Sequence, residues 1–347
     1  MLPIPALRHL AALAVPAVLL ACAPGAAAAR PGPSSVEPSA CAAPRKLEPG
    51  ESWRDPSPHR CGSVTVNGVR LHYLDWGGSG EPLVLLHGLG TTSHVFDDLA
   101  PRLTDRFRVI ALTRRGHAES EHPEGGYTIE QTTADVLAFL DTLGIRRAHV
   151  AGHSLGGAEA MRLGVEHPDR VRRIVFLDGL PDWTDVESID GHDEPRRPPP
   201  GDAFRTVAGH REWLRGAFYG FWTPALEADF RYSGPNPAAN AALRGDAFAR
   251  APEYARLRVP VLAIVALNTM ATAFPWLAAP GADPEARRRA DTYLEQVFNP
   301  YQQRRADRFR ANTPDGEVLL LEGSHYIQNS NADAVVRAMR RFLLQPG

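Results

Sequence analysis

A strand that turns directly into a helix through Gly152-His153-Ser154-Leu155-Gly156 is the feature that most constrains this sequence. The turn it predicts is sharp and strained, so small residues are needed on both sides for the backbone to pass. Such a turn lifts the hydroxyl of Ser154 above the strand ends and aims the N–H of Leu155 at a reacting oxygen. The motif therefore predicts a nucleophilic serine at the carboxyl edge of a sheet.

Strands and helices alternate around this turn. Short apolar runs predict buried strands, at 82–86, 109–112, 148–152, 174–177, 261–265 and 318–321. Helical patterns cover 127–143, 155–167, 284–309 and 332–344. A β-hairpin should precede them, because polarity alternates on both sides of Asn67-Gly68, a type I′ turn signal. This alternation favours an α/β fold with a mostly parallel sheet covered by helices on both faces, formed by 63–179 and 258–347.

A second candidate segment, His87-Gly88-Leu89-Gly90, follows the predicted strand 82–86. Its glycines leave the backbone free to point an amide at a developing oxyanion. The N–H groups of Leu89 and Leu155 are therefore the expected oxyanion donors. Losing one such donor typically costs about 2.7–4 kcal/mol of transition-state stabilisation.

One of the 13 histidines is placed to act as a general base. His325, in Gly323-Ser324-His325, follows the last predicted strand and precedes the last helix. An imidazole with a pKa of about 6.5 can take the serine proton and return it to the leaving group. His153 is beside the serine but has the wrong position for a base, and the role of His117 is open.

The segment 180–257 interrupts the alternation, because it contains no convincing buried strand. It is rich in aromatic residues, namely Trp183, Phe204, Trp213, Phe218, Tyr219, Phe221, Trp222, Phe230 and Tyr232. We interpret it as a helical lid inserted between two late strands. An alternative is a surface excursion with a small core of its own, and both can hold, since a lid must also pack.

Composition excludes several classes of function. The chain has 347 residues, 44% of them apolar, and a formal net charge of -2. A nucleic-acid partner is not expected, because binding phosphates needs a basic face. Beyond the N-terminus no apolar run is long enough to span a bilayer. No spacing of cysteine and histidine suggests a zinc site, and no metal or organic cofactor is expected.

The N-terminal residues 1–29 have the layout of an export signal: one cation, an apolar run over 10–20, then small residues. An alanine-rich, unfolded start is the alternative. Cleavage after Ala27-Ala28-Ala29 would suit an ordinary signal peptidase. Leu19-Leu20-Ala21-Cys22 instead resembles a bacterial lipoprotein box, in which Cys22 would carry a lipid anchor after cleavage at Ala21. We expect a secreted or envelope-attached protein.

The remaining cysteines fit that expectation. If Cys22 is lipidated or removed, Cys41 and Cys61 form an even pair, which can join as a disulfide in an oxidising compartment. The bond would attach the irregular segment 30–62, interpreted as a tether, to the folded body. Two free thiols are the alternative.

Taken together, these motifs resemble the α/β-hydrolase superfamily, in its lidded branch of serine esterases and lipases. The resemblance runs from about residue 64 to 344 and is weakest across the lid. It rests on five segments: Leu85-Leu86-His87-Gly88, Arg115-Gly116-His117, Gly152-His153-Ser154-Leu155-Gly156-Gly157, His167-Pro168-Asp169-Arg170-Val171 and Gly323-Ser324-His325. It implies Ser154 as nucleophile, His325 as base and the Leu89 and Leu155 amides as the oxyanion hole. A serine at the elbow argues against the dehalogenase and epoxide hydrolase branches, which have aspartate there.

The acid of the triad departs from the family pattern. It usually follows the strand that is 261–265 here, but Ala266-Leu267-Asn268 contains no carboxylate. In some members the acid follows the preceding strand, which points to Asp178. Asp182 and Asn268 are the alternatives. Thr113 and Ala118 also depart, since many relatives have Asp and Gly there.

The expected chemistry is acyl transfer from a small-molecule ester to water, with an apolar or aromatic group bound under the lid. The same triad could serve a C–C bond hydrolase, an amidase or a cofactor-free perhydrolase. A non-catalytic ligand-binding member of the fold is the further alternative, and a carboxylate beside His325 would argue against it. The sequence does not indicate the oligomeric state.

Overall fold

The protein is described from a computed structural model over residues 36–38, 41–188, 192, 194–197, 199–216 and 220–346. The predicted export signal and Cys22 lie outside these residues, as do Phe218 and Tyr219 of the insertion. Among the described residues, no helix has both the length and the apolar character that a membrane span requires.

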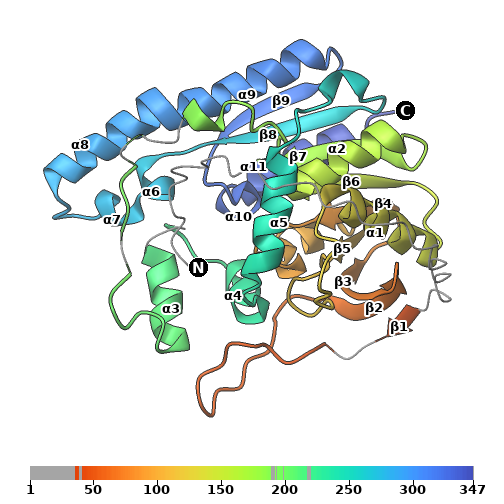
Figure 1. Ribbon diagram of the computed structural model, residues 1–347, viewed down its shortest axis with the longest axis horizontal. Coiled ribbons are helices and arrows are strands. Elements are labelled where there is room, and N and C mark those ends of the chain that lie inside the picture. Colours follow the sequence, from red (N-terminus) through yellow and green to blue (C-terminus); the bar gives the residue numbers. More distant parts are fainter. Residues whose placement is uncertain are drawn as a thin grey trace, which may run out of the picture.

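A nine-stranded sheet forms the centre of the molecule, in the order β1-β2-β3-β5-β4-β6-β7-β8-β9 (Figure 1). Its strands are β1 (Val36–Pro38), β2 (Arg60–Val66), β3 (Val69–Gly77), β4 (Glu81–Leu86), β5 (Phe107–Leu112), β6 (Ala148–His153), β7 (Val171–Leu177), β8 (Val261–Leu267) and β9 (Glu317–Glu322). The strands from β5 to β9 along this order are parallel, and the β2–β3 hairpin pairs antiparallel with β5. The α/β-hydrolase fold expected from the sequence is confirmed.

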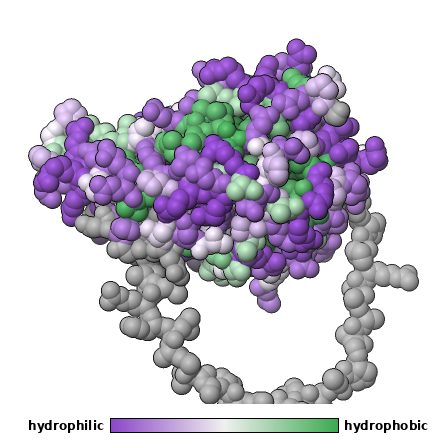
Figure 2. All heavy atoms as spheres, turned by 90° about the horizontal axis from the view of Figure 1, so that it is seen from above, coloured by the Kyte–Doolittle hydropathy of each residue, from purple (hydrophilic) through white to green (hydrophobic). Residues whose placement is uncertain are grey.

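Helices cover both faces of the sheet, because the inner strands are apolar on both sides. One face packs against α1 (Ile129–Thr142), α2 (Gly156–Glu166) and α9 (Asn299–Asn312). The other packs against the short helices η1 (Ser93–Phe96) and η2 (Ala100–Leu103) and against α11 (Ala332–Leu343), which follows the single turn α10 (Ile327–Ser330). Figure 2, viewed from above, shows a largely polar surface on which apolar side chains gather most densely near the middle.

The predicted helix 284–309 is divided into α8 (Pro284–Tyr293) and α9, with a wider π-helical turn, Leu294–Phe298, between them. Pro300 explains the interruption: it has no N–H to donate to the carbonyl four residues earlier. The two halves also pack differently: α9 places Ala306 and Phe309 in the cluster on the sheet, whereas α8 places Ala290 and Tyr293 against Phe274 and Leu277.

Between β7 and β8, the described part of the insertion is helical. It contains η3 (Val186–Ser188), α3 (Val207–Leu214), α4 (Pro224–Tyr232), α5 (Pro237–Phe248) and η5 (Tyr254–Arg256), and no strand. The starts of α3, α4 and α5 are stabilised by capping side chains, those of Thr206, Thr223 and Asn236. Each accepts a hydrogen bond from a backbone N–H in the first turn of its helix. Two further short helices, α6 (Met270–Ala273) and α7 (Pro275–Ala278), follow β8.

Residues 41–59 have no helix or strand, yet they pack on the body. Lys46 donates hydrogen bonds to the carbonyl oxygens of Phe230 (2.6 Å) and Ser233 (2.8 Å) at the end of α4. The predicted disulfide between Cys41 and Cys61 is confirmed and closes a separation of 20 residues. Residues 41–59 of the predicted tether are thus irregular in backbone and packed on the body, whereas Val36–Pro38 of the same segment form strand β1 of the sheet.

Candidate active site

Ser154 occupies the sharp turn between β6 and α2. Its φ of 52° is left-handed, a conformation that a non-glycine residue adopts only where the surrounding structure imposes it. The glycines on either side are required by close backbone approach: a Cβ on Gly152 would lie 2.3 Å from the Gly156 oxygen, and one on Gly156 would lie 2.2 Å from the Leu86 oxygen. The strained serine turn predicted from the sequence is therefore present.

Asp178 follows β7, the strand next to β6, and also has a left-handed φ, of 45°. Its Oδ2 accepts a hydrogen bond from Nδ1 of His325 at 2.7 Å. Its Oδ1 accepts one from the N–H of Ala266 at 3.0 Å and one from Nε2 of Gln302 at 2.8 Å. Burial alone would raise the pKa of Asp178, but the hydrogen bond and charge of His325 hold it below the usual value. The contact between Asp178 and His325 expected from the sequence is present.

Neither of the alternative partners hydrogen-bonds to His325, whose Nδ1 binds Asp178. Asp182 accepts hydrogen bonds from the hydroxyl of Thr184 and from Nε of Arg308, both at 2.7 Å. The backbone of Asn268 exchanges two hydrogen bonds of 2.9 Å with the side chain of Asn299. Gln302 was not identified from the sequence, where a glutamine in a polar helix gives no signal.

His153 links the serine turn to His325. Its Nε2 donates to the carbonyl oxygen of His325 at 2.9 Å, and the two rings lie 4.9 Å apart. Burial and the charge of His325 lower the pKa of His153 to about 3, so its neutral ring is too weak a base to take a serine proton near neutrality. By contrast, the His325 side chain is 47% exposed. Because Ser154 directly follows His153, the serine and His325 come to the same edge of the sheet.

The segment after β4 lies over the serine. A Cβ on Gly88 would be 3.1 Å from Cβ of Ser154. Leu155 precedes the first turn of α2 in helical conformation, where an N–H has no carbonyl of its own helix to bind. Leu89 packs with Leu155 in one apolar cluster. The oxyanion role of the Leu89 and Leu155 amides stays a prediction.

A buried ion pair, not identified from the sequence, holds this segment. Arg114 donates to the carbonyl oxygens of His87 (2.7 Å) and Gly88 (3.2 Å). The same guanidinium binds Glu159 of α2 through two hydrogen bonds of 2.7 and 2.6 Å. Arg114 therefore holds the backbone that precedes Leu89 in place, and the carboxylate of Glu159 compensates the buried charge of the guanidinium.

His117 has a structural position beside the same segment. Its Nε2 accepts from the N–H of Gly90 at 3.4 Å, and its Nδ1 donates to the carbonyl oxygen of Arg115 at 3.0 Å. Burial and the neighbouring Arg114 lower the pKa of His117 to about 3. Ala118 adopts a left-handed φ of 42°.

Residues 81–220 match the family model described as alpha/beta hydrolase fold. By sequence, the chain is 37% identical over 113 residues to 2-(acetamidomethylene)succinate hydrolase of Mesorhizobium japonicum, a match that spans 33% of this chain and 40% of the relative. By structure, it is similar to E-2-(acetamidomethylene)succinate hydrolase (TM-score 0.60, 21% identity, 82% of this chain and 99% of the other). It is also similar to the enol-lactonase from Burkholderia xenovorans (TM-score 0.55, 24% identity, 82% and 100%).

Proposed function

Since the chain belongs to the α/β-hydrolase superfamily, we propose that it is a serine hydrolase that cleaves carboxylic esters through an acyl-enzyme. The observation that carries this proposal is the arrangement at one sheet edge of a serine with left-handed backbone and a histidine bound to a buried aspartate. That pairing also argues against a non-catalytic binding protein, which has no need of an ionised carboxylate behind an exposed imidazole.

Each residue has a chemical role in this mechanism. His325 takes the proton of Ser154 as the hydroxyl attacks the acyl carbonyl. Asp178 holds the proton on Nδ1, so that Nε2 is free to accept, and stabilises the imidazolium that forms. The amides of Leu89 and Leu155 receive the oxyanion. The imidazolium then gives its proton to the alcohol oxygen, and the alcohol leaves the acyl-enzyme behind. Water attacks the acyl-enzyme with His325 again as base, and the proton returns to Ser154 as the acid leaves.

Apolar residues around the oxyanion segment favour an apolar or aromatic substrate group. Leu89 and Leu155 pack in one cluster with Leu243 of α5 and with Trp183. Trp183 stacks on Phe248 at 4.9 Å between ring centroids. An apolar substrate group bound beside the serine would therefore be transferred from water to contact with these apolar side chains, which is favourable. The resemblance to an enol-lactonase agrees with an ester substrate; C–C hydrolase, amidase and perhydrolase activity on the same triad are the alternatives.

A fluorophosphonate probe tests the proposal directly. We expect the probe to add its mass to the peptide containing Ser154, and Ser154→Ala to prevent labelling while leaving the circular dichroism unchanged. Ser188→Ala, at an exposed serine of the insertion, is the matched control and should label fully. Turnover of p-nitrophenyl esters of increasing acyl length, beside the matching anilide, then separates esterase from amidase. Labelling at another residue, or activity retained in Ser154→Ala, would contradict the assignment.

We further propose that the protein is exported, which the Cys41–Cys61 disulfide supports because such bonds persist in oxidising compartments. Intact mass of the mature protein should show loss of at least residues 1–21. A lipid adduct on Cys22 would select the lipoprotein route, and a mature chain beginning near residue 30 would select ordinary cleavage. Recovery of the uncleaved chain from the cytoplasm would contradict export.

A further inference from the structure

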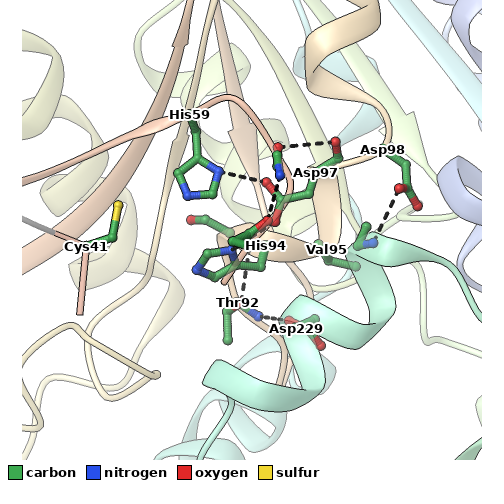
Figure 3. Close-up of polar contacts among 12 residues, drawn as sticks. Cys41, His59, Thr92, His94, Val95, Asp97, Asp98 and Asp229 are labelled. Carbon is green, nitrogen blue, oxygen red and sulfur yellow. Dashed lines mark hydrogen bonds and ion pairs between the residues drawn. The ribbon is translucent and has the colours of Figure 1, made fainter. Parts of the chain in front are cut away.

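Four side chains of types that can bind a metal ion gather where the irregular segment 41–59 meets η1. Figure 3 labels three of them, His59, His94 and Asp97. Asp55 and His59 come from that segment, and His94 and Asp97 come from η1 and its end. One ligand atom from each lies within 4.8 Å of all the others. The four side chains are between 1% and 9% exposed.

The hydrogen atoms available in this group do not satisfy its acceptors. Nδ1 of His94 lies 2.8 Å from Oδ2 of Asp97 and 2.9 Å from Oδ2 of Asp55, but a ring nitrogen has one proton. Asp97 receives it, and Oδ2 of Asp55 is buried without a hydrogen-bond donor. A buried carboxylate oxygen in this state is costly, unless something positive lies between the two acids.

A divalent cation would satisfy these atoms together. Two imidazole nitrogens and two carboxylate oxygens suit zinc, whereas magnesium and calcium bind oxygen ligands almost alone. Tetrahedral bonds of about 2.0–2.1 Å place neighbouring ligand atoms roughly 3.3 Å apart. The contacts of 2.8 and 2.9 Å at Nδ1 of His94 would thus have to open by a few tenths of an ångström, and the wider pairs of the group, which lie up to 4.8 Å apart, would have to close. Two carboxylates would also neutralise the ion.

A third carboxylate stands behind the group. Glu119 is 7% exposed, and neither of its oxygens has a hydrogen-bond partner in the part of the chain that the structure describes. Its Oε1 is 3.9 Å from Nε2 of His94, the ring nitrogen that faces away from Asp55 and Asp97. Histidines that bind a metal through one nitrogen usually donate the other N–H to a carboxylate, which fixes the ring. Glu119 has the position for that acceptor.

We propose that Asp55, His59, His94 and Asp97 form a structural zinc site that joins the N-terminal segment to η1. The Cys41–Cys61 disulfide restrains the same segment. The sulfur atoms of both cysteines lie within 4.8 Å of a ring nitrogen of His59. The ion would restrain η1, which begins directly after the segment 87–92 that contains Leu89. The site is separate from Ser154 and does not depend on the esterase proposal.

The competing occupant is a proton. With His94 protonated between Asp55 and Asp97, the group is a buried ion-pair network with no metal. The two states differ in zinc content, which is measured directly. Protein purified with its disulfide intact is saturated with zinc sulfate, desalted and analysed by mass spectrometry for metal. We expect about one zinc ion per chain, and removal by dipicolinate should lower the melting temperature.

Variants locate the ion. Asp55→Asn and His59→Asn should each lose most of the zinc, and Ser154→Ala should keep it. His149→Asn is the matched control, because His149 also pairs with a carboxylate, that of Glu81 at 2.9 Å, but outside the group. It should keep the zinc. If the ligand variants do not fold, cobalt added to the wild-type protein should give the intense visible absorption of a tetrahedral site.

Several results would overturn the proposal. Wild-type protein with less than about 0.2 zinc per chain after saturation, and no tetrahedral cobalt spectrum, identifies the proton as the occupant. Zinc retained in Asp55→Asn and His59→Asn, or lost in Ser154→Ala, places the ion elsewhere. Stoichiometric zinc whose removal leaves the melting temperature unchanged contradicts the structural role.

Discussion

Replacing Asp178 with asparagine tests the role of the carboxylate without removing its shape. Oδ1 of Asp178 accepts from two donors, the N–H of Ala266 and Nε2 of Gln302. The amide oxygen of an asparagine must stay at this position, because the opposite orientation would turn its NH₂ toward both donors. The NH₂ then faces Nδ1 of His325, which has to become an acceptor. The ring proton moves to Nε2, and His325 can no longer accept the proton of Ser154.

The expected magnitude follows from this change of tautomer. The loss of a correctly oriented base costs about 10³–10⁴ in kcat, or roughly 4–5.5 kcal/mol at 1.36 kcal/mol for each tenfold. Folding should change much less, because the asparagine keeps both donors and still hydrogen-bonds His325. We expect the free energy of unfolding to change by about 1–2 kcal/mol.

The assay is kcat for a p-nitrophenyl ester, measured beside urea unfolding of the same preparation. Asp182→Asn is the matched control. Asp182 is equally buried and pairs with Arg308, so the variant should lose stability but keep turnover within about threefold. The reasoning is refuted if Asp178→Asn retains kcat within tenfold of wild type, or if Asp182→Asn lowers it as far.

Three further changes test other parts of the structure. Cys41→Ser with Cys61→Ser opens a loop of 20 residues' separation and should lower the free energy of unfolding by about 3 kcal/mol, as measured in urea; no change would mean that the segment is held without the bond. Gly157→Ala places a Cβ 1.7 Å from the Gly179 oxygen and should lower the melting temperature sharply. In Gly245→Ala, in α5, the added Cβ meets nothing within 4 Å, so this control should raise the free energy of unfolding by about 0.5–1 kcal/mol. Equal effects of the two substitutions would contradict the close approach at Gly157. The pKa of His153 is about 3 in the folded protein, which is below its value in the unfolded chain. With respect to this group the protein is therefore fully stable above about pH 6.5 and loses stability as the pH falls toward 3, because the unfolded chain takes up the proton first. Between pH 7 and 5 the loss is about 2 kcal/mol, and His153→Asn should show a shallower decline in urea unfolding than wild type; parallel declines would contradict the folded pKa.

The sheet edge was predictable because its signals are local. The strand before Ser154, the helix after it and the glycines between them are consecutive in the chain. Asp178 followed from the family resemblance together with topology, since the carboxyl ends of neighbouring parallel strands share one edge. The hydrogen bonds that orient Asp178 could not be predicted, because Gln302 approaches from a distant helix and has no sequence pattern.

The cluster of Asp55, His59, His94 and Asp97 was hidden for a related reason. Its two halves lie in an irregular segment and in a short 3₁₀-helix, neither of which has a hydrophobic period that fixes which side chains face inward. Their spacings match no common zinc motif. The interruption at Pro300 was visible in the sequence, but the helical pattern on both sides masked it.

The helices of the insertion are attached to the rest of the protein to different degrees. In α4, Asp229 accepts from the N–H of Thr92 at 2.6 Å, and Tyr232 stacks on His94 with ring centroids 4.0 Å apart. Moving α4 would strand a buried backbone donor and separate that stack, at a cost of about 1–3 kcal/mol for the donor alone. By contrast, α3 has no buried residue. Displacing α3 therefore costs less free energy than displacing α4. A cross-link that fixes α3 to the body would for this reason restrict the motion of the insertion more than one that fixes α4.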